Sequence, residues 1–414
     1  MVGFFFVVLM SVMLNIFNPS SAQALSQTAL AFTPEHEAER REITAPEWSN
    51  LPLYYKSESL PAKLLEYSRG LLAAPTYFTS TCSAPVKVHY LMMKFDERQF
   101  PRGGNGAKGP VVILPGRGEP SFKYIEAAYD LFQKGYGPIY ALDHRGQGLS
   151  DRLDFSVVNK KIVQFPLLRQ SAYINHLDSF ECYISDLKQF LDDVVLRFHS
   201  MQEVNFVAHS TGATMLAGFV NNSVRSGNVV PRKIAYVSPM FGIDSIDNAV
   251  TQILKDPLGS LGSYWKIMNC FPEDGCMDIA KDGLFNRSLY FDTMNVLTRS
   301  KERFLYYHLA MNFWPQAITE SLTTGWIQES RRYLNELNYD RQRAPETEIL
   351  AFKAGDDLVI DNNSIDQFCN DRRSDFKSCE VNGSFKVSFH SMLIEKDDVR
   401  QSLLDKIDVF FQAK

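Results

Sequence analysis

The sequence predicts an α/β fold, with a mostly parallel β-sheet flanked by helices. Three observations support this prediction. Short apolar runs rich in β-forming residues recur along the chain, helical patterns lie between several of them, and one long segment without a clear strand interrupts the alternation. Buried parallel strands are typically short continuous apolar runs, and their alternation with helices is typical of α/β domains. The expected strands are residues 111–114, 138–142, 204–208, 234–237, 349–352 and 385–389.

Helices are expected at residues 125–134, 177–198 and 213–220. The second is the clearest, because its apolar residues recur at steps of three and four. The interrupting segment holds three of the four tryptophans, and we interpret it as a helical lid inserted late in the core. We therefore expect a signal peptide at 1–24, the first part of the core with an N-terminal extension at 25–242, the helical lid at 243–340, and the last part of the core at 341–414.

Composition excludes several classes of protein. The chain has 414 residues, of which 45% are hydrophobic and 22% are charged, and its net charge is −5. This balance is that of an ordinary globular protein rather than of a disordered or collagen-like chain. A nucleic-acid-binding protein normally shows a basic footprint, and no run of lysines and arginines here is longer than a pair. We therefore expect no nucleic-acid partner.

The N-terminal segment has the features of an export signal. Residues 1–24 contain no charged side chain, and the apolar run at 2–17 ends before small residues that include Ala22-Gln23-Ala24. As a helix this run would span ~24 Å, less than the ~30 Å core of a bilayer. A short apolar segment followed by an A-x-A pattern indicates a cleaved signal peptide. We expect a periplasmic or secreted protein, with an uncleaved membrane anchor as the alternative.

An exported protein with an even number of cysteines is expected to form disulfides. The six cysteines allow 15 pairings, but two pairs are close in the sequence, Cys270 with Cys276 and Cys369 with Cys379. That leaves Cys82 with Cys182. Because Cys182 lies off the apolar face of the helix expected at 177–198, we expect an exposed position there, where a free thiol would be oxidised unless it had a partner.

The residues Ala208-His209-Ser210-Thr211-Gly212 lie between an expected strand and an expected helix. A serine between small residues at such a strand–turn–helix junction is the pattern of a nucleophile elbow. We therefore predict that Ser210 is a catalytic nucleophile. His209 is interpreted as a packed or hydrogen-bonded neighbour rather than a base.

An acid and a histidine follow at later strand ends. Asp357 comes after the strand expected at 349–352, and His390 comes after the last expected strand. The order Ser…Asp…His along the chain is that of the α/β-hydrolase triad. His390 would take the proton of Ser210, and Asp357 would orient the imidazole and stabilise its charged form. Asp356 and Asp361 are the alternatives for the acid.

The oxyanion hole of such an enzyme is made of two backbone N–H groups. We predict that of Thr211, directly after the nucleophile, and that of Arg117 in the glycine-containing turn at 115–119. This turn could instead hold a phosphate, but it lacks the third glycine of the dinucleotide fingerprint. Neither a Walker motif nor a metal-binding His/Cys spacing is present, so no cofactor is expected.

These motifs together resemble the bacterial membrane-associated lysophospholipases, which are close relatives of the monoacylglycerol lipases in the serine-aminopeptidase-like branch of the α/β hydrolases. The most selective matches are Pro115-Gly116-Arg117 and the stretch Pro-Met-Phe-Gly-Ile at 239–243. Thr211 departs from the pattern, because methionine is expected there beside the acyl pocket. The other matching stretches are 143–150, 208–212, 295–298, 324–326, 357–362 and His390 with 395–397.

The resemblance implies a serine hydrolase that cleaves the acyl ester of a lysophospholipid through an acyl-serine intermediate. A monoacylglycerol lipase or general carboxylesterase is the first alternative. An aminopeptidase of the same fold is the second, with Glu320, Glu329 and Glu336 as candidates to hold an amine. A catalytically inactive binding protein is disfavoured by the complete set of Ser, Asp and His. The expected partner is a single-chain lipid, with peripheral membrane contact through the lid.

Two further features have a structural interpretation. His144 and Arg145 could bind a headgroup, but the loop at 143–150 is better explained as a tight turn in which Arg145 forms a local ion pair. The tryptophans of the lid are interpreted as core aromatic residues rather than acyl-chain contacts.

Overall fold

The structure is a computed structural model of the chain. It describes residues 74–82, 85–95, 106–152, 174–175, 179–243, 267–268, 295–304 and 321–413, together with 67, 71, 177, 306–307, 317 and 319. The chain divides into two compact units, and the unit formed by 1–54 and 154–172 lies outside these residues, as does the expected signal peptide.

The core of the other unit is an eight-stranded sheet in the order β1-β2-β4-β3-β6-β7-β10-β11. Strand β2 pairs antiparallel with both β1 and β4, and all other neighbours pair in parallel. The predicted α/β fold with a mostly parallel sheet is therefore confirmed. The strands are β1 (Thr76–Ser80), β2 (Val86–Met93), β3 (Val111–Leu114), β4 (Ile139–Leu142), β6 (Asn205–His209), β7 (Lys233–Val237), β10 (Ala344–Ala354) and β11 (Phe376–Phe385).

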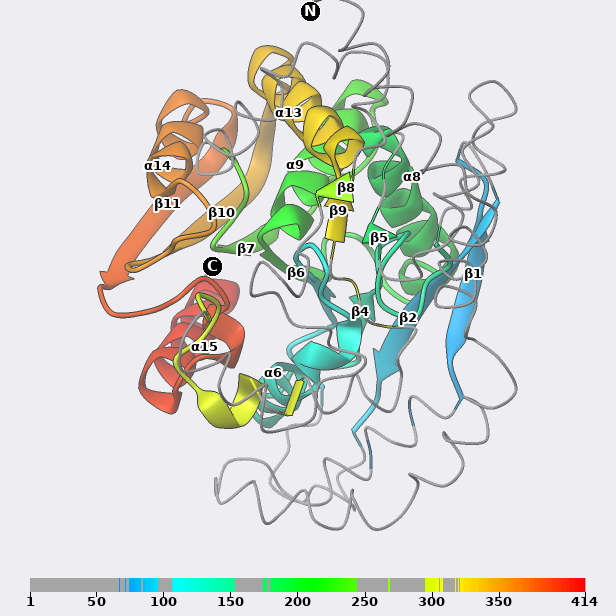
Figure 1. Cartoon of the computed structure of the whole chain (residues 1–414). Helices are drawn as coiled ribbons and strands as arrows, with labels where there is room; N and C mark the ends of the chain where they lie inside the picture. Colours follow the sequence, from blue (N-terminus) through cyan, green and yellow to red (C-terminus); the bar gives the residue numbers. More distant parts are fainter. Residues whose placement is uncertain are drawn as a thin grey trace, which may run out of the picture. The chain divides into compact units, whose positions relative to one another are not determined.

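Helices cover both faces of this sheet. Figure 1 shows one group of helices on one side and another group on the other. The first group is α8 (Phe180–Phe190), α9 (Thr211–Arg225) and α13 (Thr324–Tyr339), and the second is α6 (Ile125–Gln133) and α15 (Asp397–Gln412). Helix α14 (Asn362–Asp371) packs beside β10 and β11. A π-helical turn, η3 (Leu191–Val195), continues α8 and ends the amphipathic stretch earlier than predicted.

The strands that were correctly predicted are those buried on both faces. Every residue of β3, β4, β6 and β7 is buried, which explains their continuous apolar sequence. The strand predicted at 385–389 was wrong, because the last strand is β11 at Phe376–Phe385. It is an edge strand with many exposed residues, so its sequence lacks an apolar run. The opposite edge, β1, was missed for the same reason.

The segment at 243–340 contains two strands that were not expected. Strands β8 (Ile267–Met268) and β9 (Ser321–Thr323) pair with each other, and β9 also pairs with β5 (Ile174–Asn175). Strands of two or three residues are too short to show an alternating pattern. The helical part is represented by α13, while 244–266 and 269–294 lie outside the described residues. The lid and its boundaries therefore stay a prediction.

No helix within the described part of the chain is long and apolar enough to cross a membrane.

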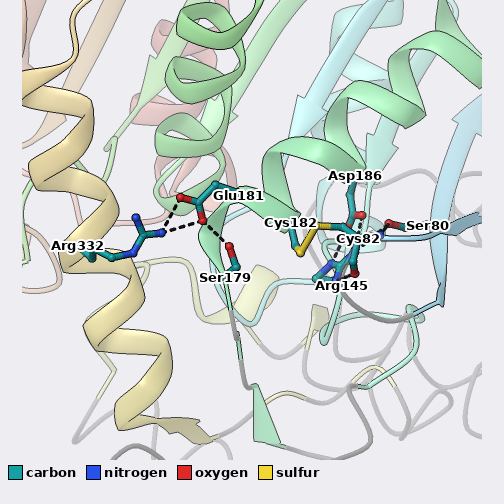
Figure 2. The surroundings of a disulfide bond; sticks show 8 residues. All are labelled: Ser80, Cys82, Arg145, Ser179, Glu181, Cys182, Asp186 and Arg332. Carbon is teal, nitrogen blue, oxygen red and sulfur yellow. Dashed lines mark hydrogen bonds and ion pairs between the residues drawn. A yellow bond between two sulfur atoms is a disulfide. The ribbon is translucent and has the colours of Figure 1, made fainter. Parts of the chain in front are cut away.

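Two of the three predicted disulfides are present. Cys82 and Cys182 are bonded with a Cα–Cα distance of 5.4 Å, and Cys369 and Cys379 with one of 5.2 Å. Cys182 is only 1% exposed, so its predicted exposure was wrong. Strand β1 packs against α8, and Cys82, which follows this strand, is bonded to Cys182 (Figure 2). The predicted pair of Cys270 and Cys276 lies outside the described residues.

A buried arginine lies beside the first of these disulfides. Arg145 makes a two-point ion pair with Asp186 of α8, at 2.6 and 2.7 Å, and also donates to the backbone carbonyl of Cys82 and the hydroxyl of Ser80 (Figure 2). The structural interpretation of Arg145 is therefore correct, although its partners are distant in the sequence.

Candidate active site

Ser210 occupies a sharp turn between β6 and α9. Its φ of 50° and ψ of −120° lie where residues with a side chain rarely occur, and such strain is typical of a nucleophile elbow. The turn is possible only because Gly212 has no side chain. A Cβ there would lie 2.5 Å from the carbonyl oxygen of Leu114 and 2.6 Å from that of Pro115. The elbow thus packs directly on the chain that leaves β3.

The turn at 115–119 continues past the nucleophile. A Cβ on Gly116 would lie 3.1 Å from the Cβ of Ser210, so the backbone of Gly116 lies against the serine. Arg117 follows directly. Neither its backbone N–H nor that of Thr211 forms a hydrogen bond with a described residue. Since Thr211 is the first residue of α9, its N–H is one of those that a helix leaves without a partner. The N–H that follows Ser210 and the N–H that follows Gly116 thus both lack a partner among the described residues.

The loop at 143–150 supports this turn. The side-chain amide of Gln147 donates to the carbonyl of Gly116 and accepts from the N–H of Gly118, both at 2.9 Å. The Nε2 of His144 donates to the carbonyl of Pro115 at 2.7 Å. The role of Gln147 was not predicted. Its only signal in the sequence was a polar side chain within a glycine-containing loop after a core strand.

A buried carboxylate lies under the same turn. Glu119 is 6% exposed, and its Oε2 accepts from the N–H of Gly116 at 2.7 Å and from the hydroxyl of Tyr124, while its Oε1 pairs with Lys123. Burial alone would raise the pKa of Glu119, but the charges of His209 and Lys123 hold it well below its usual value. This acid is therefore ionised and serves as an acceptor for several donors. Sequence reasoning missed it.

His209 connects Glu119 to the other half of the site. Its Nδ1 lies 2.8 Å from Oε2 of Glu119, and its Nε2 lies 3.2 Å from the backbone carbonyl of His390. Both ring nitrogens are therefore engaged, and the prediction that His209 is a hydrogen-bonded neighbour is confirmed. The two imidazole rings lie 4.7 Å apart between their centroids.

Asp357 and His390 come together from the ends of β10 and β11. The Nδ1 of His390 lies 2.8 Å from Oδ2 of Asp357. The other carboxylate oxygen, Oδ1, accepts from the N–H groups of Val359 at 2.9 Å and Ile360 at 3.1 Å. Of the two alternative acids, Asp361 caps α14 by accepting from the N–H of Asn363. The structure therefore places Asp357 against His390.

Asp356, the other alternative acid, is exposed. Its backbone N–H donates to the carbonyl of Ser388 at 2.9 Å, and its side chain neither contacts His390 nor caps a helix.

The pKa shifts of Asp357 and His390 favour a neutral histidine beside an ionised carboxylate. Burial lowers the pKa of His390 below its ordinary 6.5, although the hydrogen bond with Asp357 opposes that shift. Burial would raise the pKa of Asp357, but the bond and charge of His390 outweigh it and lower that pKa. Asp357 is thus ionised and His390 is available to accept a proton near neutral pH.

The hydroxyl of Ser210 does not form a hydrogen bond with the ring of His390 in this structure. Catalytic hydrogen bonds are often long before a substrate binds and become shorter in the complex. No group of three or more His, Cys, Asp or Glu within the described part of the chain could hold a metal ion.

Trp326 is the one tryptophan of the inserted segment that the structure describes. It is 1% exposed, and its Nε1 donates to the hydroxyl of Tyr183 on α8 at 3.2 Å. It is a core aromatic residue, as predicted. Trp265 and Trp314 lie outside the described residues.

Comparison with known proteins is consistent with this geometry. Residues 105–397 match the model of a family described as serine aminopeptidase, S33. Lysophospholipase L2 of Escherichia coli is 28% identical over 310 residues, which cover 73% of this chain and 79% of that protein. A probable lysophospholipase L2 of Haemophilus influenzae is 26% identical over 310 residues, covering 73% and 84%.

A similar fold occurs among solved structures. The monoglyceride lipase of Saccharomyces cerevisiae, solved as a soluble variant with a substrate analogue, superposes with a TM-score of 0.54. The sequences are 14% identical, and the match covers 86% of this chain and 98% of that one. This similarity concerns the fold of the two chains.

Proposed function

The chain belongs to the serine aminopeptidase S33 family, and on that premise we propose that it is a serine hydrolase that cleaves the acyl ester of lysophospholipids. Two observations support the reaction type: the strained backbone of Ser210 at the turn between β6 and α9, and the hydrogen-bonded pair of Asp357 and His390, whose imidazole lies 4.7 Å from that of His209 between ring centroids. The substrate class is supported by the two relatives, both named lysophospholipase L2.

The proposed reaction proceeds in two steps. His390 takes the proton of Ser210 as its oxygen attacks the ester carbonyl, and then gives that proton to the leaving glycerol oxygen. A water molecule, activated by His390 in the same way, hydrolyses the acyl-serine and releases the fatty acid. Asp357 orients the imidazole and stabilises its charged form. The backbone N–H groups of Arg117 and Thr211 stabilise the negative oxygen of each tetrahedral intermediate.

The direct test is fatty-acid release from lysophosphatidylcholine, a monoacylglycerol and short-chain p-nitrophenyl esters under matched conditions. We expect hydrolysis of the long-chain lipid, because each buried CH₂ contributes ~0.8 kcal/mol. Activity confined to acetyl or butyryl esters would contradict the lipid assignment and leave a general carboxylesterase. A monoacylglycerol preference would favour the first alternative.

The aminopeptidase alternative needs acidic residues that are available to bind an amine, and the two candidates on α13 are already paired. Glu329 and Glu336 both pair with Arg332, which also bonds Glu181 of α8 (Figure 2 shows this last contact). Glu329 and Glu336 are therefore engaged by an arginine of their own helix, whereas Arg332 and Glu181 join α13 to α8. Glu320 lies outside the described residues. Aminoacyl anilides in the same substrate panel would show the peptidase activity if it existed.

We also propose that the protein is exported and begins near Leu25. The charge-free segment at 1–24 and the two disulfides support this location, because such bonds persist in oxidising compartments. Mass spectrometry of the native N-terminus tests it, and a chain that begins at Met1 would contradict cleavage. Contact of the lid with a membrane is part of the same proposal, and vesicle co-sedimentation of the purified protein measures it.

A further inference from the structure

Arg117 differs from the buried arginines of the chain. Four arginines in the described part are at most 6% exposed, and a buried charge is costly unless it is paired. Each of the four has a carboxylate partner. The pairs are Arg145 with Asp186, Arg303 with Glu126, Arg372 with Asp375 and Arg400 with Asp130.

Arg117 forms no ion pair with any carboxylate of the described chain. Its Nη1 is buried and has no hydrogen-bond partner among the described residues. Burial lowers the pKa of its guanidinium below the usual value. The side chain thus has a buried donor that no described residue uses.

The surroundings of this guanidinium are aromatic. Its central carbon lies 6.0 Å from the centre of the Trp326 ring, and that ring is held by the hydroxyl of Tyr183. Glu119 acts on Arg117 electrostatically but forms no ion pair with it, because its carboxylate is bonded to Lys123 and to the turn. The ring of Trp326 lies near the guanidinium and carries no charge that could neutralise it.

Arg117 is also next in the chain to the residue that lies against the nucleophile. Arg117 directly follows Gly116, whose backbone lies against Ser210. Unlike the four paired arginines, Arg117 is partly exposed. A partly exposed arginine whose guanidinium has no ion-pair partner among the described residues therefore lies on the turn that flanks the nucleophile.

We propose that the side chain of Arg117 binds the phosphate of the substrate headgroup, while its backbone N–H serves the oxyanion. This inference rests on the proposed lysophospholipase function. The planar guanidinium matches phosphate oxygens through two parallel hydrogen bonds. In a lysophospholipid only the glycerol backbone separates the phosphate from the acyl ester, so one turn can serve both groups. A monoacylglycerol offers a neutral hydroxyl at the same place and cannot compensate the charge.

The first test compares lysophosphatidylcholine with the monoacylglycerol of the same acyl chain. We expect Arg117→Met to lower the ratio of their kcat/KM values by roughly 10- to 100-fold, since a hydrogen bond to a charged group is worth more than a neutral one. Arg117→Lys keeps the charge but not the planar fork, so its ratio should lie between those of Arg117→Met and the wild type. An unchanged ratio in Arg117→Met overturns the proposal.

A second assay removes the acyl chain and the lipid aggregate from the measurement. Glycerophosphocholine should inhibit hydrolysis of p-nitrophenyl butyrate competitively, and its inhibition constant should rise in Arg117→Met by a similar factor. Inorganic phosphate and glycerol serve as the headgroup-free and charge-free comparisons. Inhibition by phosphate alone points to a general anion site, and equal inhibition of wild type and variant contradicts the assignment of Arg117.

Thermal unfolding separates binding from a structural role. Arg117→Met removes an unpaired charge and should leave the Tm unchanged or higher, whereas Arg145→Met leaves Asp186 buried without a partner and should lower it. A Tm loss in Arg117→Met equal to that in Arg145→Met would indicate a structural residue. An enzyme that cleaves p-nitrophenyl butyrate but neither lipid would overturn the proposed function, while the inhibition assay would still decide whether Arg117 binds the phosphate.

Discussion

The two sides of the candidate site are held in different ways. The nucleophile side, residues 115–119, 143–150 and 208–212, is buried at every position except the partly exposed Arg117. The acid–base side, residues 355–361 and 386–390, lies nearer the surface, and Leu358 and Val387 on it are 69% and 58% exposed. One side is part of the core, and the other consists of two loops at its rim.

The contacts differ in the same way. On the nucleophile side the turn is held by side chains, chiefly the amide of Gln147 and the carboxylate of Glu119. On the acid–base side the two loops are joined through the N–H groups of Gly355 and Asp356, which donate to the hydroxyl and the carbonyl of Ser388 at 3.1 and 2.9 Å. The bond of Asp357 with His390 is another contact between them. Changes on the nucleophile side should therefore affect both stability and rate, and changes on the acid–base side chiefly the rate.

The largest expected loss of activity follows from changing one residue on each side, Ser210 on the nucleophile side or His390 on the acid–base side. Ser210→Ala and His390→Ala should each lower kcat by about 10⁴–10⁶, because a triad acts as a unit, and the double variant should lose little more. Steady-state hydrolysis of a p-nitrophenyl ester measures all three variants, with circular dichroism to confirm the fold. Losses that multiply in the double variant would show that the two residues do not share one proton transfer.

The next effect is confined to the acid–base side. Asp357→Asn should lower kcat by about 10⁴, since the neutral amide favours the wrong tautomer of the histidine. Asp356→Asn is the matched control, because that residue is exposed and does not contact the ring. A larger loss in Asp356→Asn than in Asp357→Asn would overturn the assignment of the acid.

The same comparison explains how much of the site the sequence predicts. The elbow around Ser210 lies between buried elements with a strong apolar pattern, so its place in the fold followed from local sequence. His390 was found from the order of the motifs, although the strand before it was placed nine residues too late, at 385 instead of 376. Edge strands carry polar residues on an exposed face, and the pattern that marks a buried strand is absent there.

The contacts between distant segments could not be predicted. Glu119 stands next to a predicted oxyanion turn, yet nothing in its sequence context shows that His209 and Lys123 will meet it. The same holds for Gln147, whose partners are 29 and 31 residues away. Such partners are set by how strands are ordered in the sheet, and a single sequence does not reveal that order.

Glu119→Gln should lower kcat/KM by less than the ~10²–10³ that follows loss of an oxyanion donor, because Glu119 is a positioning residue. The Glu119→Gln protein should also be less stable than the wild type, since Lys123 remains buried without its charge partner. The double variant Glu119→Gln/Lys123→Met should recover stability in urea denaturation. If the double variant regains stability but not activity, the carboxylate is needed to hold the turn, and full recovery of both would contradict a positioning role.

The pH profile of this variant gives a readout that a purely structural role would not change. His390 must be neutral to act as a base, so kcat/KM should rise with pH, with a midpoint below 6.5 because burial lowers the pKa of His390. The negative charge of Glu119 raises that pKa. Its removal should therefore lower the pKa further and move the midpoint to more acidic pH. A midpoint that moves upward or stays fixed would show that the charge does not act on His390.

The smallest expected effect on activity concerns the disulfide behind the acid–base side. Cys369→Ser/Cys379→Ser opens a bond between α14 and β11 that closes a separation of 10 residues, worth about 2.7 kcal/mol in the chain-entropy model. The bond of Cys82 closes a separation of 100 residues, worth about 4.7 kcal/mol. In urea denaturation, Cys82→Ser/Cys182→Ser should therefore lower the free energy of unfolding by more than Cys369→Ser/Cys379→Ser does. Activity should persist in the first variant, because Asp357 still holds His390 there, and a loss of turnover in folded protein would show that the rim loops depend on this crosslink.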